Sequence, residues 1–182
     1  TMGAIFGGGI GILFNESTSV FLLPLMILFG AIGGAFWATI PAILKTKFNT
    51  NEILTSLMLT YVALFILDYF VVGPWKDPAG YGLPKSMPFP DAGRLPVLFD
   101  GLRVHIGVYF AIIICFITYI VYNKTLFGFK LKVSGLSSKA SQYAGFKYKN
   151  LIFYTFIISG ACAGLAGLFE VSGPIGLLYL SL

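Results

Sequence analysis

The sequence predicts an all-α integral membrane protein, a bundle of several membrane-spanning helices. Of its 182 residues, 57% are hydrophobic and only 10% are charged, and the mean hydropathy is +0.88. An average soluble domain is about one quarter charged, so this chain has too few charges to cover a water-exposed surface. Four long apolar runs come close to the roughly 20 residues that a helix needs to cross a bilayer. Because the chain begins and ends inside apolar runs, we expect a piece of a longer protein, with partial spans beside the four full ones.

The first expected span follows a short, glycine-rich apolar segment and ends close to Pro41. Proline lacks a backbone N–H, so Pro41 predicts a kink or an end of the helix there. Asn49, with Glu52 three residues later, fits a capping box at the start of the next helix. The expected spans are approximately residues 20–44, 53–72, 106–122 and 151–171.

Small residues recur at four-residue spacing in these runs. Such stripes lie on one helix face and allow a neighbouring backbone to approach closely. We therefore expect close helix packing where they occur, at Gly3, Gly7 and Gly11, at Gly30, Gly34 and Ala38, and at Gly160 and Gly164.

The charges of the connections predict the orientation. The connection 123–150 has six lysines and no acid, the turn 45–52 has two lysines and one acid, and the proline-rich connection 73–105 has four basic and three acidic residues. Basic connections stay in the cytoplasm. We expect 123–150 to form a cytoplasmic loop and 73–105 an outer loop. The net charge of +5 is thus a topology signal, and no nucleic-acid partner is expected.

The basic stretch 126–149 carries five lysines and no acid between two apolar runs. Its middle, residues 137–144, predicts a two-turn helix with Ser137 or Ser138 as N-cap and Gly145 as its stop. A short basic helix between two spans is positioned to face another protein in the cytoplasm.

A polar stripe marks the second span. Glu52, Ser56 and Thr60 lie four residues apart, which places them on one helix face. The stripe predicts either the wall of a path for a polar, neutral solute or ordinary interhelical hydrogen bonding, with Glu52 as a capping residue. The candidate path-lining residues are Asn51, Glu52, Thr55, Ser56, Thr60 and Tyr61.

Residues for enzyme chemistry are missing from the sequence. Nothing matches the GxxxxGK[ST] phosphate loop, and the one histidine, His105, has no paired carboxylates or serine nucleophile in a recognisable pattern. Cys115 and Cys162 lie in apolar runs and lack metal-ligand spacing. We expect no catalytic residue, no metal and no cofactor in this chain.

Four stretches of the sequence resemble a known family. The run KVSGLSSKASQYAGF at 132–146 resembles R-A-x-G-x-N-x-x-A-A-x-Y-A-G-I, the cytoplasmic loop of bacterial ABC importer permeases of the branched-chain amino acid, ribose and simple-sugar superfamily. The runs NEILTSLMLTYVA at 51–63 and GPWKDPAGYGLPKS at 73–86 are similar to stretches of the nucleoside and simple-sugar permeases within it, and SGACAGLAGLFEVSG at 159–173 resembles their following helix.

The resemblance implies a helical permease of the type II importer kind, with more spans than are present here. It implies that residues 137–144 form a coupling helix that docks on a separate ATPase subunit, which binds the ATP. It also implies a second permease subunit, identical or different, an extracytoplasmic solute-binding lipoprotein, and a place in the bacterial cytoplasmic membrane. The coupling residues would be Lys132, Gly135, Ser137, Ser138, Lys139, Ala140, Tyr143, Ala144 and Gly145.

The implied cargo is a nucleoside or a simple sugar. A branched-chain amino acid fits less well, because a zwitterion needs a charged or helix-end partner and the spans hold almost no charge. Two other classes of function stay open: a channel or membrane scaffold that uses no ATP, and a membrane-embedded enzyme, for which catalytic residues are not found.

Overall fold

The computed structural model describes residues 1–14, 21–78, 85–96 and 105–179. The described helices are α1 (Met2–Leu13), α2 (Leu22–Phe48), α3 (Glu52–Val72), the short 3₁₀ helix η1 (Asp91–Gly93), α4 (Gly107–Lys124), α5 (Leu126–Leu136), α6 (Ser138–Tyr143), α7 (Tyr148–Glu170) and the π-helical turn η2 (Val171–Ile175). Outside the helices, the described part of the chain contains two isolated β-bridges and no strand.

Four of these helices are long and apolar enough to cross a membrane: α2, α3, α4, and α7 with the first residues of η2. The prediction of an all-α, multi-span fold is confirmed. The structure places α2 at Leu22–Phe48, where a span at 20–44 was expected, so the helix continues past Pro41 for seven residues. Pro41 is buried beside α7 and α3, whose packing holds the helix together where one backbone hydrogen bond is lacking.

The turn between α2 and α3 uses its two asparagines differently from the expected capping box. Asn49 adopts the left-handed conformation, with φ 52°, and ends α2. Asn51 is the N-cap of α3, because its side-chain oxygen accepts a hydrogen bond from the backbone N–H of Ile53 at 3.0 Å. Asparagine suits both roles, since its short amide side chain tolerates the left-handed region and satisfies an unpaired N–H group.

The centre of the molecule is a bundle of α1, α2 and α7, and glycines make its contacts. A Cβ atom on Gly34 would lie 2.7 Å from the Cα of Gly164, and a Cβ on Gly164 would lie 2.9 Å from the Cα of Gly34. A Cβ on Gly3 would collide with the backbone of Gly164 as well. The three backbones therefore touch directly, and the stripes of small residues are helix-packing surfaces.

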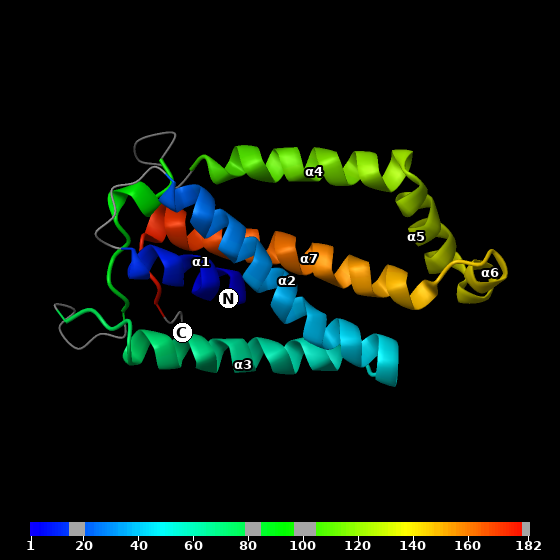
Figure 1. The fold of residues 1–182 in the computed structure, drawn as a ribbon, viewed down its shortest axis with the longest axis horizontal. Coiled ribbons are helices and arrows are strands. Elements are labelled where there is room, and N and C mark those ends of the chain that lie inside the picture. Colours follow the sequence, from blue (N-terminus) through cyan, green and yellow to red (C-terminus); the bar gives the residue numbers. More distant parts are fainter. Residues whose placement is uncertain (15–20, 79–84, 97–104, 180–182) are drawn as a thin grey trace.

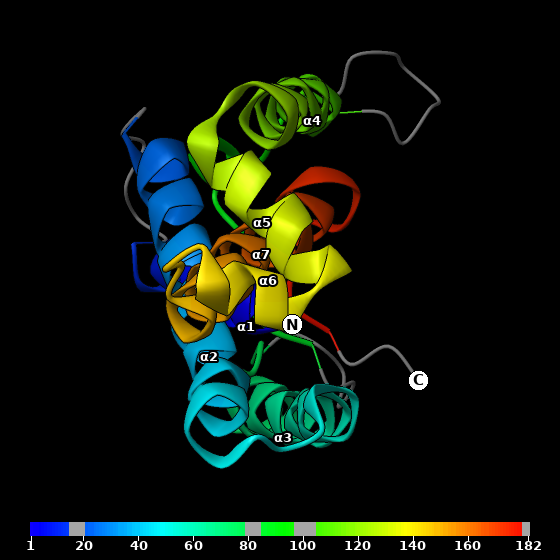
Figure 2. The ribbon, with the colours of Figure 1, turned by 90° about the vertical axis from the view of Figure 1, so that its right-hand side faces the viewer.

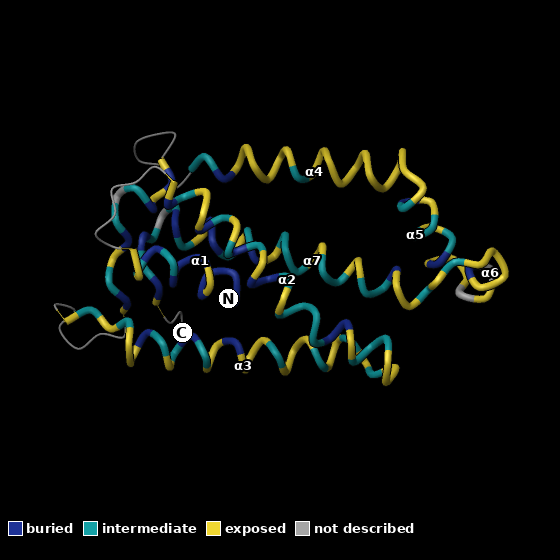
Figure 3. Tube along the Cα trace, in the orientation of Figure 1, coloured by how far each residue is buried: buried dark blue, intermediate teal, exposed yellow. Residues whose placement is uncertain are grey.

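The helices α3 and α4 flank this bundle on opposite sides (Figures 1 and 2). Seen end-on, α1, α2 and α7 lie between them. The tube in Figure 3 is almost wholly exposed along α4, where Gly107 is the one residue of the described helix that is buried. Apolar side chains that face outward over a whole helix suit a lipid or protein environment rather than water.

The two ends of the bundle differ in what they carry. The turn from α2 to α3 and the segment α5–α6 lie at one end, and the connection from α3 to α4 lies at the other (Figure 1). At this second end, the described residues 85–96 pair with the segment after α7: the N–H of Leu95 donates to Ser172 O at 2.9 Å and that of Phe89 to Gly176 O at 2.8 Å. The two segments expected on the cytoplasmic side thus share one end.

Candidate functional site

The basic stretch after α4 folds into two helices instead of one. A loop with a two-turn helix was expected, but α5 (Leu126–Leu136) precedes the short α6 (Ser138–Tyr143). Thr125 caps α5, since its hydroxyl oxygen accepts a hydrogen bond from the N–H of Gly128 at 3.3 Å. Ser137 is extended, with φ −156° and ψ 117°, and separates the two helices. Gly145, with φ +74°, turns the chain toward α7, a conformation that costs glycine little.

A buried hydrogen bond joins α5 and α6. The hydroxyl oxygens of Ser134 and Ser141 lie 2.8 Å apart, and Ser141 is completely buried. Lys130 also lies over the ring of Phe146, with its Nζ 5.6 Å from the ring centroid. We call residues 126–146 the coupling arm. Its two helices are held to each other through side chains as well as through the chain.

The base of the coupling arm is tied to the end of α4. The Nζ of Lys132 donates a hydrogen bond to Asn123 Oδ1 at 2.9 Å and lies 4.6 Å from the centroid of the Tyr122 ring. Lys132, one of the predicted coupling residues, is exposed, and its Nζ lies at the end of α4. Contacts of this kind set the angle between α4 and α5.

The other predicted coupling residues lie toward the tip of the coupling arm. Exposed residues among them are Gly135, Ser137, Lys139, Tyr143, Ala144 and Gly145. Tyr143 is 92% exposed, and around Gly135 and Gly145 no described atom lies within 4 Å of the position of a Cβ. The backbones of Ser138 and Ala140 belong to α6, while their side chains lie outside what the structure describes. The tip therefore presents an unusually open surface.

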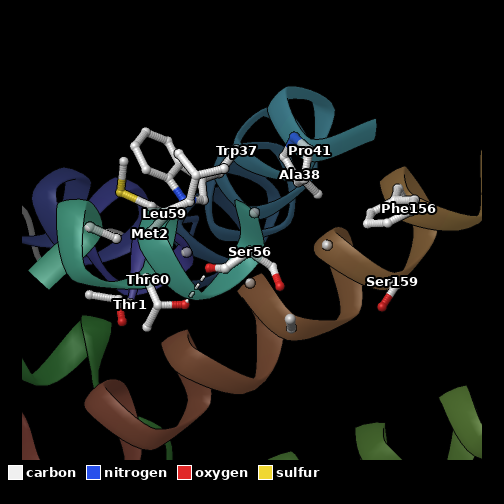
Figure 4. Close-up of a pocket in the computed structure, with 16 residues that line it drawn as sticks. Thr1, Met2, Trp37, Ala38, Pro41, Ser56, Leu59, Thr60, Phe156 and Ser159 are labelled. Carbon is white, nitrogen blue, oxygen red and sulfur yellow. Dashed lines mark hydrogen bonds between the residues drawn. The ribbon is translucent and has the colours of Figure 1, made fainter. Parts of the chain in front are cut away.

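The polar stripe of α3 borders a groove of about 290 Å³ between α1, α2, α3 and α7. Ser56 and Thr60 line its α3 side, Trp37 contributes from α2, and Phe156 and Ser159 from α7 (Figure 4). Among the described residues, the lining contains hydroxyls, aromatic rings, glycines and alkyl groups, and no acidic or basic side chain. These side chains offer hydrogen bonds and ring contacts and carry no charge.

The hydroxyls of α3 have their protons already engaged. Thr60 Oγ1 donates to Ser56 O at 2.9 Å, and Ser56 Oγ donates to Ile53 O at 3.0 Å. Each oxygen keeps its lone pairs, so the two side chains present acceptors to the groove. A solute that carries hydroxyl or N–H donors would complement them.

The remaining residues predicted to line a path lie outside this groove. Thr55 donates to Asn51 O at 3.0 Å, Asn51 caps α3, and Tyr61 is 58% exposed on another face. Glu52 pairs with Lys45, and both border a second groove, of about 330 Å³, beside α5 and α7. The structure thus brings two of the six candidates, Ser56 and Thr60, to the groove.

Sequence reasoning did not select Ser134, Ser141, Trp37 or Ser159. The pairing of the two serines depends on a helix break at Ser137, and Trp37 and Ser159 join the groove only through the crossing of α2 and α7. A polar stripe could mark the α3 side, but no local pattern marks the opposite wall.

Among the described residues, no group of three or more His, Cys, Asp or Glu side chains could hold a metal ion. His105 Nδ1 accepts a hydrogen bond from the backbone N–H of Gly107 at 3.1 Å, which gives the first N–H of α4 a partner beside the N-cap residue Ile106. Both cysteines are free thiols.

Comparison with protein families matches residues 1–176 to the family described as branched-chain amino acid transport system, permease component. The chain belongs to this family. Its members are transport components rather than enzymes, and together with the four apolar helices the family makes this a multi-pass membrane protein. The resemblance found in the four sequence stretches is confirmed.

Three of the curated relatives are described as sugar or nucleoside permeases. The chain is 37% identical to the glucose ABC transporter permease protein TsgB13 of Haloferax volcanii over 96% of this chain and 48% of the relative. It is 34% identical to the guanosine ABC transporter permease protein NupP of Bacillus subtilis, over 83% of this chain and 44% of the relative. It is 30% identical to the nucleoside ABC transporter permease protein NupB of Lactococcus lactis subsp. cremoris, over 85% and 44%.

The chain spans about half the length of the curated relatives it matches. No solved structure matches it. The permease family is therefore established by sequence, and its geometry in this chain by the fold described above.

Proposed function

We propose that this permease forms the membrane path of an ATP-driven importer, and that the coupling arm receives motion from a separate ATPase subunit. The observation that carries the proposal is the exposed tip of the coupling arm, where Tyr143 is 92% exposed and lies two residues before Gly145, whose surroundings are open. A large aromatic side chain exposed to water is costly to leave uncovered and is typical of the centre of a protein interface. The family match and the basic charge of the stretch support the same assignment.

The transported solute is proposed to be a nucleoside or a simple sugar. The groove beside α3 offers acceptor oxygens from Ser56 and Thr60 and ring faces from Trp37 and Phe156, without a charged side chain in its lining. Uncharged solutes with hydroxyl groups and a flat or apolar face suit such a wall. The names of the three relatives agree with this class.

The remaining partners follow from the importer class. An ATPase subunit would bind ATP and dock at the coupling arm, a second permease subunit would complete the path, and a solute-binding lipoprotein would deliver the solute at the end that carries residues 73–105. The lysines of the coupling arm and of the α2–α3 turn would then face the cytoplasm, in the bacterial cytoplasmic membrane.

The test is uptake of labelled uridine, adenosine and ribose into cells that carry the complete operon, with wild type compared to Tyr143→Ala. Because Tyr143 is almost fully exposed, its loss costs little packing within this chain. We expect uptake of one solute to fall at least tenfold, an effect of about 1.4 kcal/mol, which is typical of an interface anchor. The ATPase should also co-purify less with the variant.

Tyr119→Ala is the matched control, since Tyr119 is 62% exposed on α4, away from the coupling arm. Its uptake should equal that of wild type. Equal uptake by Tyr143→Ala and wild type would show that Tyr143 and its segment do not couple transport to the ATPase. That result would favour the alternative of a channel or scaffold, above all if uptake continues when the ATPase is inactivated.

A further inference from the structure

The ends of α2 and α7 that lie beside the coupling arm form a groove that the transport function does not use. It is lined by Ile43, Thr46 and Lys47 of α2 and by Lys149, Asn150 and Phe153 of α7, and its volume is about 550 Å³. We propose that this groove, the basic groove, binds the headgroup of an anionic membrane phospholipid. The inference requires that α2 and α7 span the membrane, and it is independent of what the protein transports.

The charge of the basic groove is uncompensated. Neither Lys47 nor Lys149 forms an ion pair or hydrogen bond with any described residue, and the lining includes no acidic side chain. Two lysines from different helices thus converge on one opening. Their nearest counterpart on α2, Lys45, is different, because it faces the opposite side and pairs with Glu52. The two sides of the α2–α7 contact are therefore electrostatically distinct, one neutralised and one carrying two positive charges.

The order of the side chains with depth matches a phospholipid, which has a charged headgroup above apolar acyl chains. On α2, Ile43 lies four residues before Lys47, and on α7, Phe153 lies four residues after Lys149. Because α2 ends here and α7 begins here, both apolar residues lie about 6 Å deeper in the bilayer than the lysines, at 1.5 Å per helical residue. Each helix therefore provides a cation at the membrane surface and an apolar side chain one turn below it.

The polar residues between these levels can serve the linker of the lipid. Thr46 donates its hydroxyl proton to Ala42 O at 2.8 Å, which leaves its oxygen as an acceptor, and the exposed amide of Asn150 supplies both donors and an acceptor. A phosphate between the lysines would accept hydrogen bonds from both. The Asn150 amide would donate to an ester carbonyl of the glycerol linker, and Thr46 would accept from a free hydroxyl of a glycerol headgroup. Basic pockets between membrane helices on the cytoplasmic side bind anionic headgroups.

A soluble anion would use less of this site. The Ile43 side chain is 38% exposed, and the ring of Phe153 lines the same groove, so the deeper half is an open apolar surface. Inorganic phosphate or an acidic peptide would leave that surface uncovered, whereas an acyl chain covers it. The coupling arm ends in the separate tip around Tyr143, which provides its own surface for the ATPase.

The experiment uses the complete transporter, purified in detergent and labelled with a photoactivatable phosphatidylglycerol at limiting concentration. We expect Lys47→Gln/Lys149→Gln to lower the labelling about 25-fold, since one near-surface lysine is worth about a fivefold change in affinity. The label should map to peptides that contain Ile43 or Phe153. Labelling by photoactivatable phosphatidylcholine should be weak in both proteins.

The charge-matched control is Lys124→Gln/Lys130→Gln, which removes two lysines of α4 and α5 outside the basic groove. Its labelling should stay at the wild-type level, and Phe153→Ala should lower labelling by phosphatidylglycerol without a change of charge. An equal loss in the control would overturn the proposal, because diffuse surface charge would then explain binding. If glycerol 1-phosphate competed with the labelling as strongly as the lipid does, the proposal would be overturned as well. The same holds if Lys47→Gln/Lys149→Gln lost the ATPase subunit while its lipid labelling stayed unchanged.

Discussion

The crossing of α2 and α7 makes a prediction that can be worked out from single atoms. In Gly164→Ala the new methyl group would lie 2.9 Å from the Cα of Gly34 and closer still to the carbonyl oxygen of Gly30. Carbon atoms in contact are normally about 3.5–4.0 Å apart, so the helices must separate by roughly 1 Å. Both of these atoms belong to the backbone and cannot rotate away.

The expected cost follows from two opposing terms. Alanine in place of a helical glycine favours the helix by about 1 kcal/mol. Overpacking a tight contact costs about 1–3 kcal/mol or more, and separation of α2 from α7 also loosens the contact of Gly3 in α1 with Gly164. We expect Gly164→Ala to destabilise the permease by about 1–2 kcal/mol in total. Loss of the monodisperse folded protein after heating in detergent, followed by fluorescence-detected gel filtration, measures it.

Gly135→Ala provides the comparison, because Gly135 lies in helix α5 and no described atom lies within 4 Å of its Cβ position. This variant keeps the helix-propensity gain and has no clash, so its midpoint of heat inactivation should equal or exceed that of wild type. If Gly164→Ala proves as stable as Gly135→Ala, the direct backbone contact of α2 and α7 is not the basis of the fold.

Two further predictions concern the coupling arm and the groove beside α3. Ser134→Ala leaves the buried hydroxyl of Ser141 without its partner, which costs about 1–3 kcal/mol. The amount of solute transported per ATP hydrolysed, measured in proteoliposomes with the full complex, should therefore fall. The double variant Ser134→Ala/Ser141→Ala should recover part of this ratio. A ratio that stays unchanged in the single variant would show that the serine pair does not transmit the motion. Thr60→Val removes an acceptor from the groove and should raise the KM for the transported solute about fivefold, which corresponds to the ~1 kcal/mol of one hydrogen bond. Thr55→Val is the control and should leave KM unchanged, because the hydroxyl of Thr55 bonds to Asn51 O outside the groove. Equal effects of both variants would show that the groove is not part of the solute path.

The sequence was sufficient for features that depend on composition and on short-range pattern. The excess of apolar residues predicted an all-α membrane protein with four full spans, because only helices satisfy every backbone group in runs of this composition. Gly145 indicated where α6 ends. The four-residue spacing indicated that Ser56 and Thr60 share one face of α3. The four stretches indicated the permease family, since their order and spacing are specific even where single residues differ.

Local pattern was less reliable where neighbouring segments compete. It assigned the cap of α3 to Asn49, although Asn51 holds that position, because both asparagines suit a turn and only the path of the chain selects one. It expected Pro41 to limit α2, but packing against other helices allows the helix to continue to Phe48. It also treated the start of the basic stretch as a loop, and α5 forms there.

The amino-acid sequence by itself determined that this chain is a helical membrane protein of the permease family, because hydropathy and motif spacing are properties of the chain alone. Tertiary structure alone decided which side chains meet. Ser134 reaches Ser141 through the bend at Ser137, and Ser56 and Thr60 line one groove with Trp37 and Ser159. Lys47 and Lys149 line another groove, while Lys45 is neutralised by Glu52. These pairs depend on the rotation and crossing of whole helices. Glycine contacts between backbones set that crossing, and no local sequence pattern encodes where the partner glycine lies.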